Sequence, residues 1–415
     1  ASFTPISGGV CAPKGFRAHG VKCGIKDPNS AKLDLALIYS EKPCVSSGLF
    51  TRNQIKAAPV KLSQAHLEAE IPKHGILANS GNANAAAGPD ALDRALRLAE
   101  IAAGELGIEA PQLLVASTGI IGKPMPMDRI EPQIPAAVAG LNDDGSDQAA
   151  EAIMTSDTRP KQVALEVQID GKPVRIGGIA KGAGMIRPDM ATMLAFITTD
   201  ADISQEALDS ATRDGNGESF NRITVDGDMS TNDTVFVLAN GEAGNSRIES
   251  GSAAAEEFGA ALREVMLKLA KMLVSDGERV TKFVTITVSG AKTDACAKAA
   301  AEAVGNSNLV KSSWNGNDPN WGRVIHALGY SGAEIVEEKT DIGFGGLSAA
   351  INGVTAETPI EDLVAVVSEP EFTIEINLNL GDSSYVVYAS DLSPEYVDFN
   401  RQEYAAMRAK MLEEG

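Results

Sequence analysis

The chain has 415 residues, of which 44% are hydrophobic and 22% charged, a composition typical of a globular protein with two or three domains. Its formal net charge of −20 opposes binding to phosphate backbones and anionic lipid, which argues against nucleic acid or a membrane as a partner. The sequence shows neither a secretory signal nor an apolar run of about eighteen residues, so we expect a cytoplasmic protein.

The cysteines and histidines give no sign of a disulfide framework or a zinc site. Four of each occur, without C-x-x-C pairs or ligand spacing. The loop 226–232 carries oxygen side chains at alternate positions, but Thr231 stands where a calcium loop needs glycine, and Val237 stands where it needs a bidentate glutamate. We therefore expect no metal.

Short apolar runs at 33–39 and 75–78, bounded by turn residues, predict buried strands. A helix is predicted after Gly88, with Pro89 in its first turn and a buried side formed by Leu92, Leu96, Ile101 and Leu106. These elements indicate alternating strands and helices.

Three hairpins are predicted further along the chain. Residues 163–169 alternate with period two, turn at Asp170-Gly171 and return through 174–176. The other two pair 223–225 with 235–238, and 372–380 with 385–388. A long helix with an apolar stripe is predicted from Ser252 to Leu273. The mixture predicts an α/β or α+β sandwich.

The segment 177–197 carries the most chemical information. Its glycines lack the spacing of a phosphate loop. A turn at Pro188 leads through the small residue Ala191 into Thr192, which heads the apolar run 193–197. In such a turn a threonine hydroxyl can attack the preceding carbonyl and cut the chain. The freed α-amine can then serve as general base for the same hydroxyl.

A threonine at the start of a buried strand also has a purely structural explanation, because β-branched residues favour strands. Taken alone, the pattern leaves both interpretations open. The segment resembles, however, the cleavage signature of the ornithine acetyltransferase (glutamate N-acetyltransferase) family. Further segments similar to that family occur in order along the chain, at 12–17, 55–60, 79–85, 117–119, 223–228, 230–234 and 318–323.

The resemblance implies self-cleavage between Ala191 and Thr192. It also implies a layered αββα sandwich, in which fragment 1–191 and residues 192–284 form the main body and 285–415 a smaller C-terminal α/β domain. The implied reaction moves an acetyl group from N-acetylornithine to glutamate through Thr192, without a cofactor, in an oligomer of cleaved protomers. Acetyl-CoA remains open as a further donor.

The resemblance also assigns roles to individual residues. Thr118 and Gly119 would stabilise the oxyanion of the tetrahedral intermediate. The residues implied to bind substrate, besides Thr192, are Thr155, Lys181, Glu278 and Asn400. Lys181 could bind a substrate carboxylate and Glu278 a substrate ammonium.

Two positions depart from the family pattern. Family members usually follow the glutamate with Gly-Ala, but here Arg279-Val280 follows, and Ala405 replaces a serine or threonine. Two alternatives therefore stay open, namely a family paralogue that acylates or deacylates another amino acid, and a hydrolase or aminopeptidase of the related self-cleaving type.

Overall fold

The computed structural model describes residues 3–187 and 193–413; side chains of the last helix are described to residue 403 and at 405. The chain forms two compact units. The first unit comprises Ala1–Met185, Asp189–Asn221 and Asp228–Leu273, and the second comprises Ile186–Pro188, Arg222–Gly227 and Val274–Gly415. Each unit combines a sheet with helices, which confirms the predicted α/β class.

The sheet of the first unit has nine strands. The long strand β3 links two parts of it, because residues 35–39 pair with β2 and β4, whereas residues 45–50 pair with β10. The order along the sheet is β1 (Thr4–Ile6), β6 (Lys161–Ile169), β7 (Lys172–Lys181), β8 (Leu194–Thr199), β10 (Thr234–Ala239), β3 (Leu35–Phe50), β4 (Lys73–Asn79) and β5 (Leu113–Ser117), with β2 (Phe16–Val21) beside β3.

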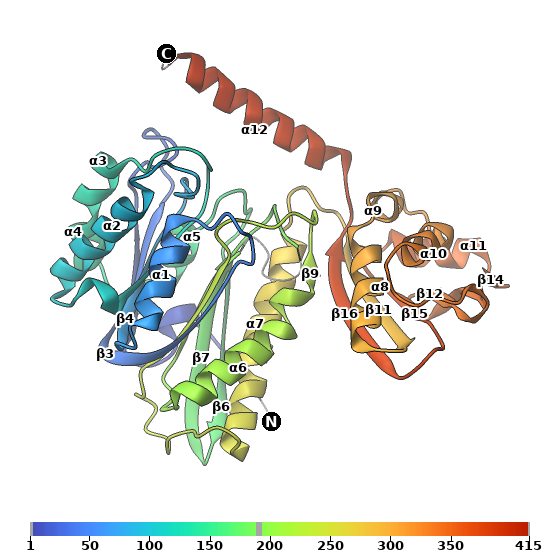
Figure 1. The fold of residues 1–415 in the computed structure, drawn as a ribbon, viewed down its shortest axis with the longest axis horizontal. Coiled ribbons are helices and arrows are strands. Elements are labelled where there is room, and N and C mark those ends of the chain that lie inside the picture. The colour runs from blue at the N-terminus through green and yellow to red at the C-terminus, as the bar shows by residue number, and fades with distance from the viewer. Residues whose placement is uncertain (1–2, 188–192, 414–415) are drawn as a thin grey trace. The chain divides into compact units, whose positions relative to one another are not determined.

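The two parts of this sheet enclose a common core. Ile38, Ile76 and Leu114 from one part cluster with Phe196 and Phe236 from the other. Helices cover the outer faces, with α1–α4 on one side and α6 and α7 on the other (Figure 1). This is the expected αββα layering. The helices are α1 (Ala58–Glu68), α2 (Ala91–Leu106), α3 (Met127–Ile130), α4 (Ile134–Ala139), α5 (Ser146–Ala152), α6 (Gln205–Gly217) and α7 (Ala253–Ser275).

The two predicted helices form, and the predicted buried side of α2 is confirmed in part, because Leu96, Ile101 and Leu106 pack partly buried against the core. Leu92 is exposed, and the buried residues are Ala95, Leu98, Ala99, Ala102 and Ala103. Small alanine side chains let the helix approach the strands closely, so most of the larger side chains lie at its margin. Helix α7 matches its prediction, because its apolar stripe from Phe258 to Leu273 is buried apart from the partly exposed Met272, and the Ser252 hydroxyl accepts from the N–H of Ala255.

Of the three predicted hairpins, only the first is formed. Strands β6 and β7 pair across Asp170-Gly171, both of which have positive φ. The second pairing is wrong, because β9 (Ile223–Thr224) joins the sheet of the second unit and β10 that of the first. The third is also wrong, because β11 lies between β15 and β16 and pairs with both.

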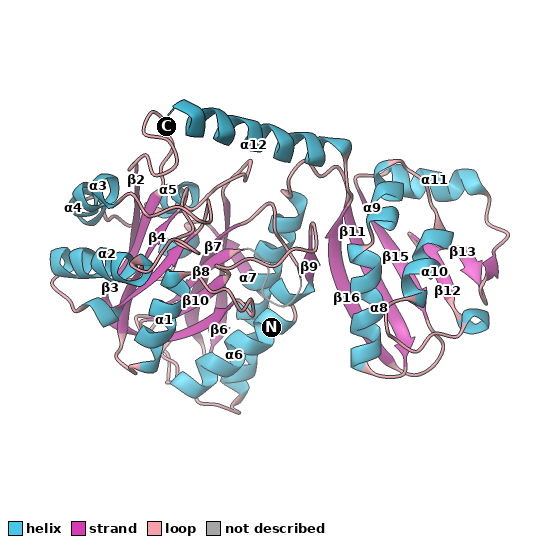
Figure 2. Cartoon of the chain, turned by 45° about the horizontal axis from the view of Figure 1, so that its top comes forward, coloured by secondary structure: helices cyan, strands magenta, loops and turns pink. Residues whose placement is uncertain are grey.

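The second unit contains a seven-stranded sheet in the order β14-β13-β12-β15-β11-β16-β9 (Figure 2). Its core surrounds the fully buried Trp314. Its remaining strands are β11 (Phe283–Ala291), β12 (Asp341–Phe344), β13 (Leu347–Ile351), β14 (Val354–Thr355), β15 (Glu371–Asn377) and β16 (Ser383–Ser390). Its helices are α8 (Asp294–Asn306), α9 (Asn308–Asn315), α10 (Trp321–Gly329), α11 (Ile360–Ser368) and α12 (Pro394–Glu413).

Short 3-10 helices occupy several connections, at Gly9–Cys11, Ala110–Gln112, Glu131–Gln133, Phe220–Arg222 and Glu337–Lys339. Over the described ranges, no helix combines the length and the apolar character needed to cross a bilayer.

Candidate active site

The proposed cleavage point, Ala191 and Thr192, lies outside the described residues. Met193 follows Thr192 and is bound to the start of β10. Its N–H donates to Oδ1 of Asp233 over 3.1 Å, and its carbonyl accepts from the N–H of Thr234 over 3.1 Å. The residue that connects Thr192 to strand β8 therefore has a fixed position.

Thr118 and Gly119 form a tight turn at the end of β5. The N–H of Thr118 donates to the Asn79 carbonyl over 2.9 Å. Gly119 has φ +132°, and a Cβ on it would lie 2.3 Å from the carbonyl carbon of Gly81. Only glycine fits there. The amide of Asn232 donates at 2.7 Å to the carbonyls of both Ser117 and Ala83, which ties the turn to the neighbouring segment.

Lys181, the last residue of β7, places its ammonium beside two hydroxyl groups. Its Nζ lies 2.7 Å from Oγ1 of Thr155 and 3.4 Å from Oγ1 of Thr118. Only 3% of the Lys181 side chain is exposed. The structure thus brings three of the residues named from the sequence, Lys181, Thr155 and Thr118, into one buried cluster.

A carboxylate that the sequence analysis did not single out, that of Asp157, lies beside the Lys181 ammonium of this cluster. Asp157 accepts from Nζ of Lys161 over 2.6 Å and lies 3.8 Å from Nζ of Lys181. Burial raises the pKa of Asp157, but Lys181 and Lys161 outweigh burial and hold it below its usual range. Asp157 is therefore ionised at neutral pH, and it supplies the charge that Lys181 needs in a buried position.

A second buried acid, Asp233, was also missed. It is fully buried, and burial raises its pKa well above the usual range, against the opposing effects of the Met193 N–H and Lys181. A carboxyl group in this setting favours its neutral, protonated form. Asp233 directly precedes β10, and it binds Met193, which directly precedes β8. It therefore joins the N-terminal ends of these two parallel strands.

Glu278 and Asn400, the remaining residues expected to bind substrate, belong to the second unit. The amide of Asn400 donates to Oε2 of Glu278 over 3.0 Å and to the Tyr396 carbonyl over 3.0 Å. Arg279 has φ +57°, and its guanidinium carbon lies 4.8 Å from the ring centroid of Phe399. Glu278 and Asn400 are thus paired, and Arg279 stacks on the last helix.

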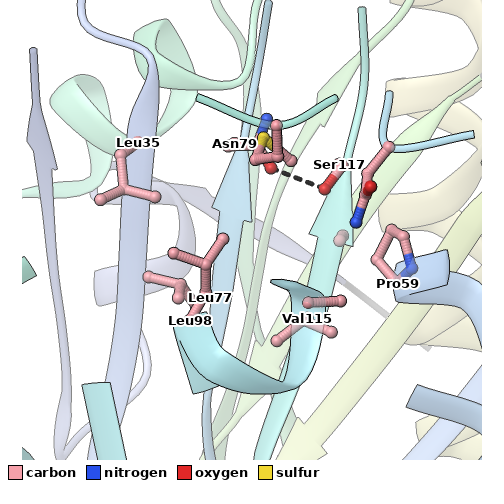
Figure 3. A pocket seen from close by; sticks show the side chains of 11 residues that line it. Leu35, Pro59, Leu77, Asn79, Leu98, Val115 and Ser117 are labelled. Carbon is pink, nitrogen blue, oxygen red and sulfur yellow. Dashed lines mark hydrogen bonds between the residues drawn. The ribbon is translucent and has the colours of Figure 1, made fainter. Parts of the chain in front are cut away.

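A small pocket in the first unit lies between α2 and the strands β4 and β5 (Figure 3). Its lining is mostly apolar, apart from Asn79, Asn84 and Ser117, and the Ser117 hydroxyl donates to Asn79 over 2.6 Å. It has room for about one water molecule, too little for an amino acid. Its polar end backs the Thr118 turn from inside the fold.

Among the described residues, no group of three or more histidine, cysteine, aspartate or glutamate side chains is arranged to hold a metal ion. The arrangement that is present suits acyl transfer, because it combines the N–H of Gly119, the hydroxyls of Thr118 and Thr155, and the buried Lys181 ammonium.

Comparison with known proteins identifies the family. A model of the ArgJ family matches residues 17–405. The arginine biosynthesis bifunctional protein ArgJ of Geobacter sulfurreducens is 47% identical over 388 residues, which are 93% of this chain and 98% of that protein. The glutamate N-acetyltransferase of Methanocaldococcus jannaschii is 43% identical over 408 residues, 96% of this chain and 98% of that protein.

A crystal structure of ornithine acetyltransferase from Mycobacterium tuberculosis, complexed with ornithine, is 39% identical; the match covers 45% of this chain and 98% of that chain, with a TM-score of 0.41. The family model and the full-length relatives are decisive, and this chain belongs to the ArgJ family.

Proposed function

We propose that this chain, an acyltransferase of the ArgJ family, transfers an acetyl group from N-acetylornithine to glutamate through an acetyl ester on Thr192. The observation that carries the proposal is the buried cluster in which the Lys181 ammonium lies beside the hydroxyls of Thr118 and Thr155. Full-length relatives named for arginine biosynthesis and for glutamate N-acetyl transfer support the choice of substrates.

The first step proposed is self-cleavage. The Thr192 hydroxyl attacks the Ala191 carbonyl, the C–N bond breaks, and the hydroxyl proton passes to the Thr192 nitrogen. Water then hydrolyses the resulting ester, which releases fragment 1–191 with a terminal carboxylate and restores the hydroxyl. The new α-amine of Thr192 has a reference pKa near 8, so it can accept a proton at neutral pH.

Acetyl transfer follows the same chemistry in two halves. The α-amine takes the hydroxyl proton while Oγ1 of Thr192 attacks the acetyl carbonyl, and ornithine leaves with that proton on its nitrogen. The amine of glutamate then attacks the acetyl ester and regenerates the hydroxyl. Thr118 and Gly119 are proposed to stabilise both tetrahedral oxyanions, an interaction worth about 2.7–4 kcal/mol per donor.

Four residues are proposed to bind the amino-acid part of the substrate. Lys181, with Thr155, would hold the carboxylate, since a buried ammonium favours an anionic partner. Glu278 would receive the substrate ammonium, and Asn400 would orient the Glu278 carboxylate through the hydrogen bond that joins them. Both assignments follow from charge complementarity with an amino acid.

Intact-mass measurement tests this proposal. Active protein should contain two fragments, the second beginning at Thr192, and incubation with N-acetylornithine should add one acetyl group to that second fragment alone. The variant Thr192→Ala should remain a single chain without turnover. An intact Ala191–Thr192 bond in active enzyme would refute the proposal, and acetate release that does not depend on glutamate would instead indicate a hydrolase.

A further inference from the structure

The ion pair between Asp157 and Lys161 lies deep in the first unit, with both side chains 0% exposed. A buried pair seldom stabilises a fold more than apolar side chains of similar size would, because both charges lose their hydration. Stability alone therefore gives little reason for these two charges, and their contacts suggest another purpose.

Both oxygens of Asp157 are used. Oδ1 accepts from Nζ of Lys161 over 2.6 Å and from the N–H of Gly182 over 2.7 Å. Oδ2 accepts from the N–H of Thr155 over 3.0 Å and lies 3.8 Å from Nζ of Lys181. One carboxylate therefore links the loop at Thr155, the first residue of β6 and the end of β7.

These contacts restrain the Lys181 ammonium and the Thr155 hydroxyl, the two groups proposed to hold the substrate carboxylate. Lys181 has a long, flexible side chain that is costly to immobilise. Asp157 attracts its ammonium and also binds the backbone N–H that follows it. The same carboxylate fixes the backbone of Thr155, whose hydroxyl lies 2.7 Å from that ammonium. Lys161 is the first residue of β6. Its ammonium donates to the Asp157 carboxylate and so fixes the position of that carboxylate.

We propose that Asp157 and Lys161 are positioning residues that hold the Lys181 ammonium and the Thr155 hydroxyl in place, and that they thereby set the preference for an acetyl donor with a carboxylate. The inference rests on the proposed function, which assigns Lys181 to that carboxylate. Neither Asp157 nor Lys161 needs to touch the substrate.

The preference is measured as a ratio. We define it as kcat/KM for N-acetylornithine divided by kcat/KM for N-acetylputrescine, which is the same donor without its carboxylate. A general loss of folded enzyme lowers both values and leaves the ratio unchanged. In cleaved Asp157→Asn the ratio should fall by about tenfold or more, because a charge-assisted hydrogen bond contributes roughly 1.5–3 kcal/mol. Lys161→Met should lower it in the same direction.

Asp200→Asn is a matched control. Asp200 is another fully buried carboxyl group in the first unit, and its oxygens accept from the N–H groups of Arg175 at 2.8 Å and Lys14 at 3.1 Å. It undergoes the same change from acid to amide, but these hydrogen bonds are to the turn at Lys14 and to Arg175 in the middle of β7, and neither Lys161 nor Lys181 is among these partners. Its ratio should equal that of the unaltered protein.

Two further variants separate the possible outcomes. The double variant Asp157→Asn, Lys161→Met removes both charges, so it should fold better than Asp157→Asn alone but keep the reduced ratio. Lys181→Met tests the proposed function itself. If a variant is not cleaved, the relative affinity for ornithine and putrescine, measured by calorimetry, supplies the same ratio.

This inference would be overturned, and the proposed function left intact, if the ratio stayed unchanged in both Asp157→Asn and Lys161→Met but fell in Lys181→Met. An unchanged ratio in Lys181→Met would instead overturn the assignment of Lys181 to the carboxylate, and this inference with it.

Discussion

The substitution Gly119→Ala should remove most of the activity while leaving the rest of the first unit folded. Gly119 has φ +132°, a region that alanine rarely adopts. Its new Cβ would lie 2.3 Å from the Gly81 carbonyl carbon and 2.5 Å from the Asn82 nitrogen, and both of these are backbone atoms. Neither neighbour can rotate away, so the turn itself must move.

The size of the effect follows from these distances. Ordinary carbon contacts need about 3.5 Å, so the turn must shift by roughly 1 Å. Oxyanion donors act at about 2.7–3.1 Å, and such a shift takes the Gly119 N–H and the Thr118 hydroxyl out of range. We expect a fall in kcat of about 100- to 1000-fold, corresponding to about 2.7–4 kcal/mol.

The assay is single-turnover acetylation of the cleaved enzyme by N-acetylornithine, with Gly122→Ala as the control. Gly122 also has positive φ, at +83°, but a Cβ there would meet no atom within 4 Å. It carries the backbone strain of about 1–2 kcal/mol without the collision. A Gly119→Ala rate close to that of the unaltered protein, or an equal loss in Gly122→Ala, would refute this reasoning.

Two other predictions concern the second unit. Burial lowers the pKa of Lys311 from 10.5 to about 8. Between these values the unfolded chain binds the extra proton, so the unfolding free energy should rise with pH across that window, by at most about 3 kcal/mol. Urea unfolding followed by the fluorescence of Trp314 and Trp321 should show this rise, and Lys311→Met should flatten it; equal slopes would contradict the assignment. Arg279→Gly should leave KM for glutamate within about threefold, because glycine adopts φ +57° freely and only a contact of about 0.5–1 kcal/mol with Phe399 is lost. A change in KM of about tenfold would show that Arg279 contacts the acceptor.

The sequence predicted where most strands lie, but not how some of them pair. Alternation and turn residues are local signals, and β6 and β7 pair because a two-residue turn joins them directly. The strands β15 and β16 are also close in sequence, yet β11, which precedes them by about eighty residues, is inserted between them. The local pattern of residues 371–390 contains no signal that a distant strand pairs between β15 and β16.

The candidate site was predicted in a similar, partial way. Family resemblance supplied Lys181, Thr155 and Thr118, and the structure places them together. Asp157 was missed because it stands in a polar loop, where an acid is usually solvated. Its importance depends on Lys161 and Lys181 reaching it from two strands, and that arrangement exists only after the hairpin has folded.

The departure at Arg279 is explained by its backbone. A positive φ at this position accounts for the glycine that the family usually carries there, because glycine adopts it without strain. Arginine accepts the same backbone at a cost, and its guanidinium stacks on Phe399 while Glu278 keeps its hydrogen bond to Asn400. The substitution therefore preserves the local arrangement of the glutamate. Ala405 lies exposed within α12, which runs on to Glu413. These contacts favour retention of the family's amino-acid substrates over a pocket rebuilt for another acceptor.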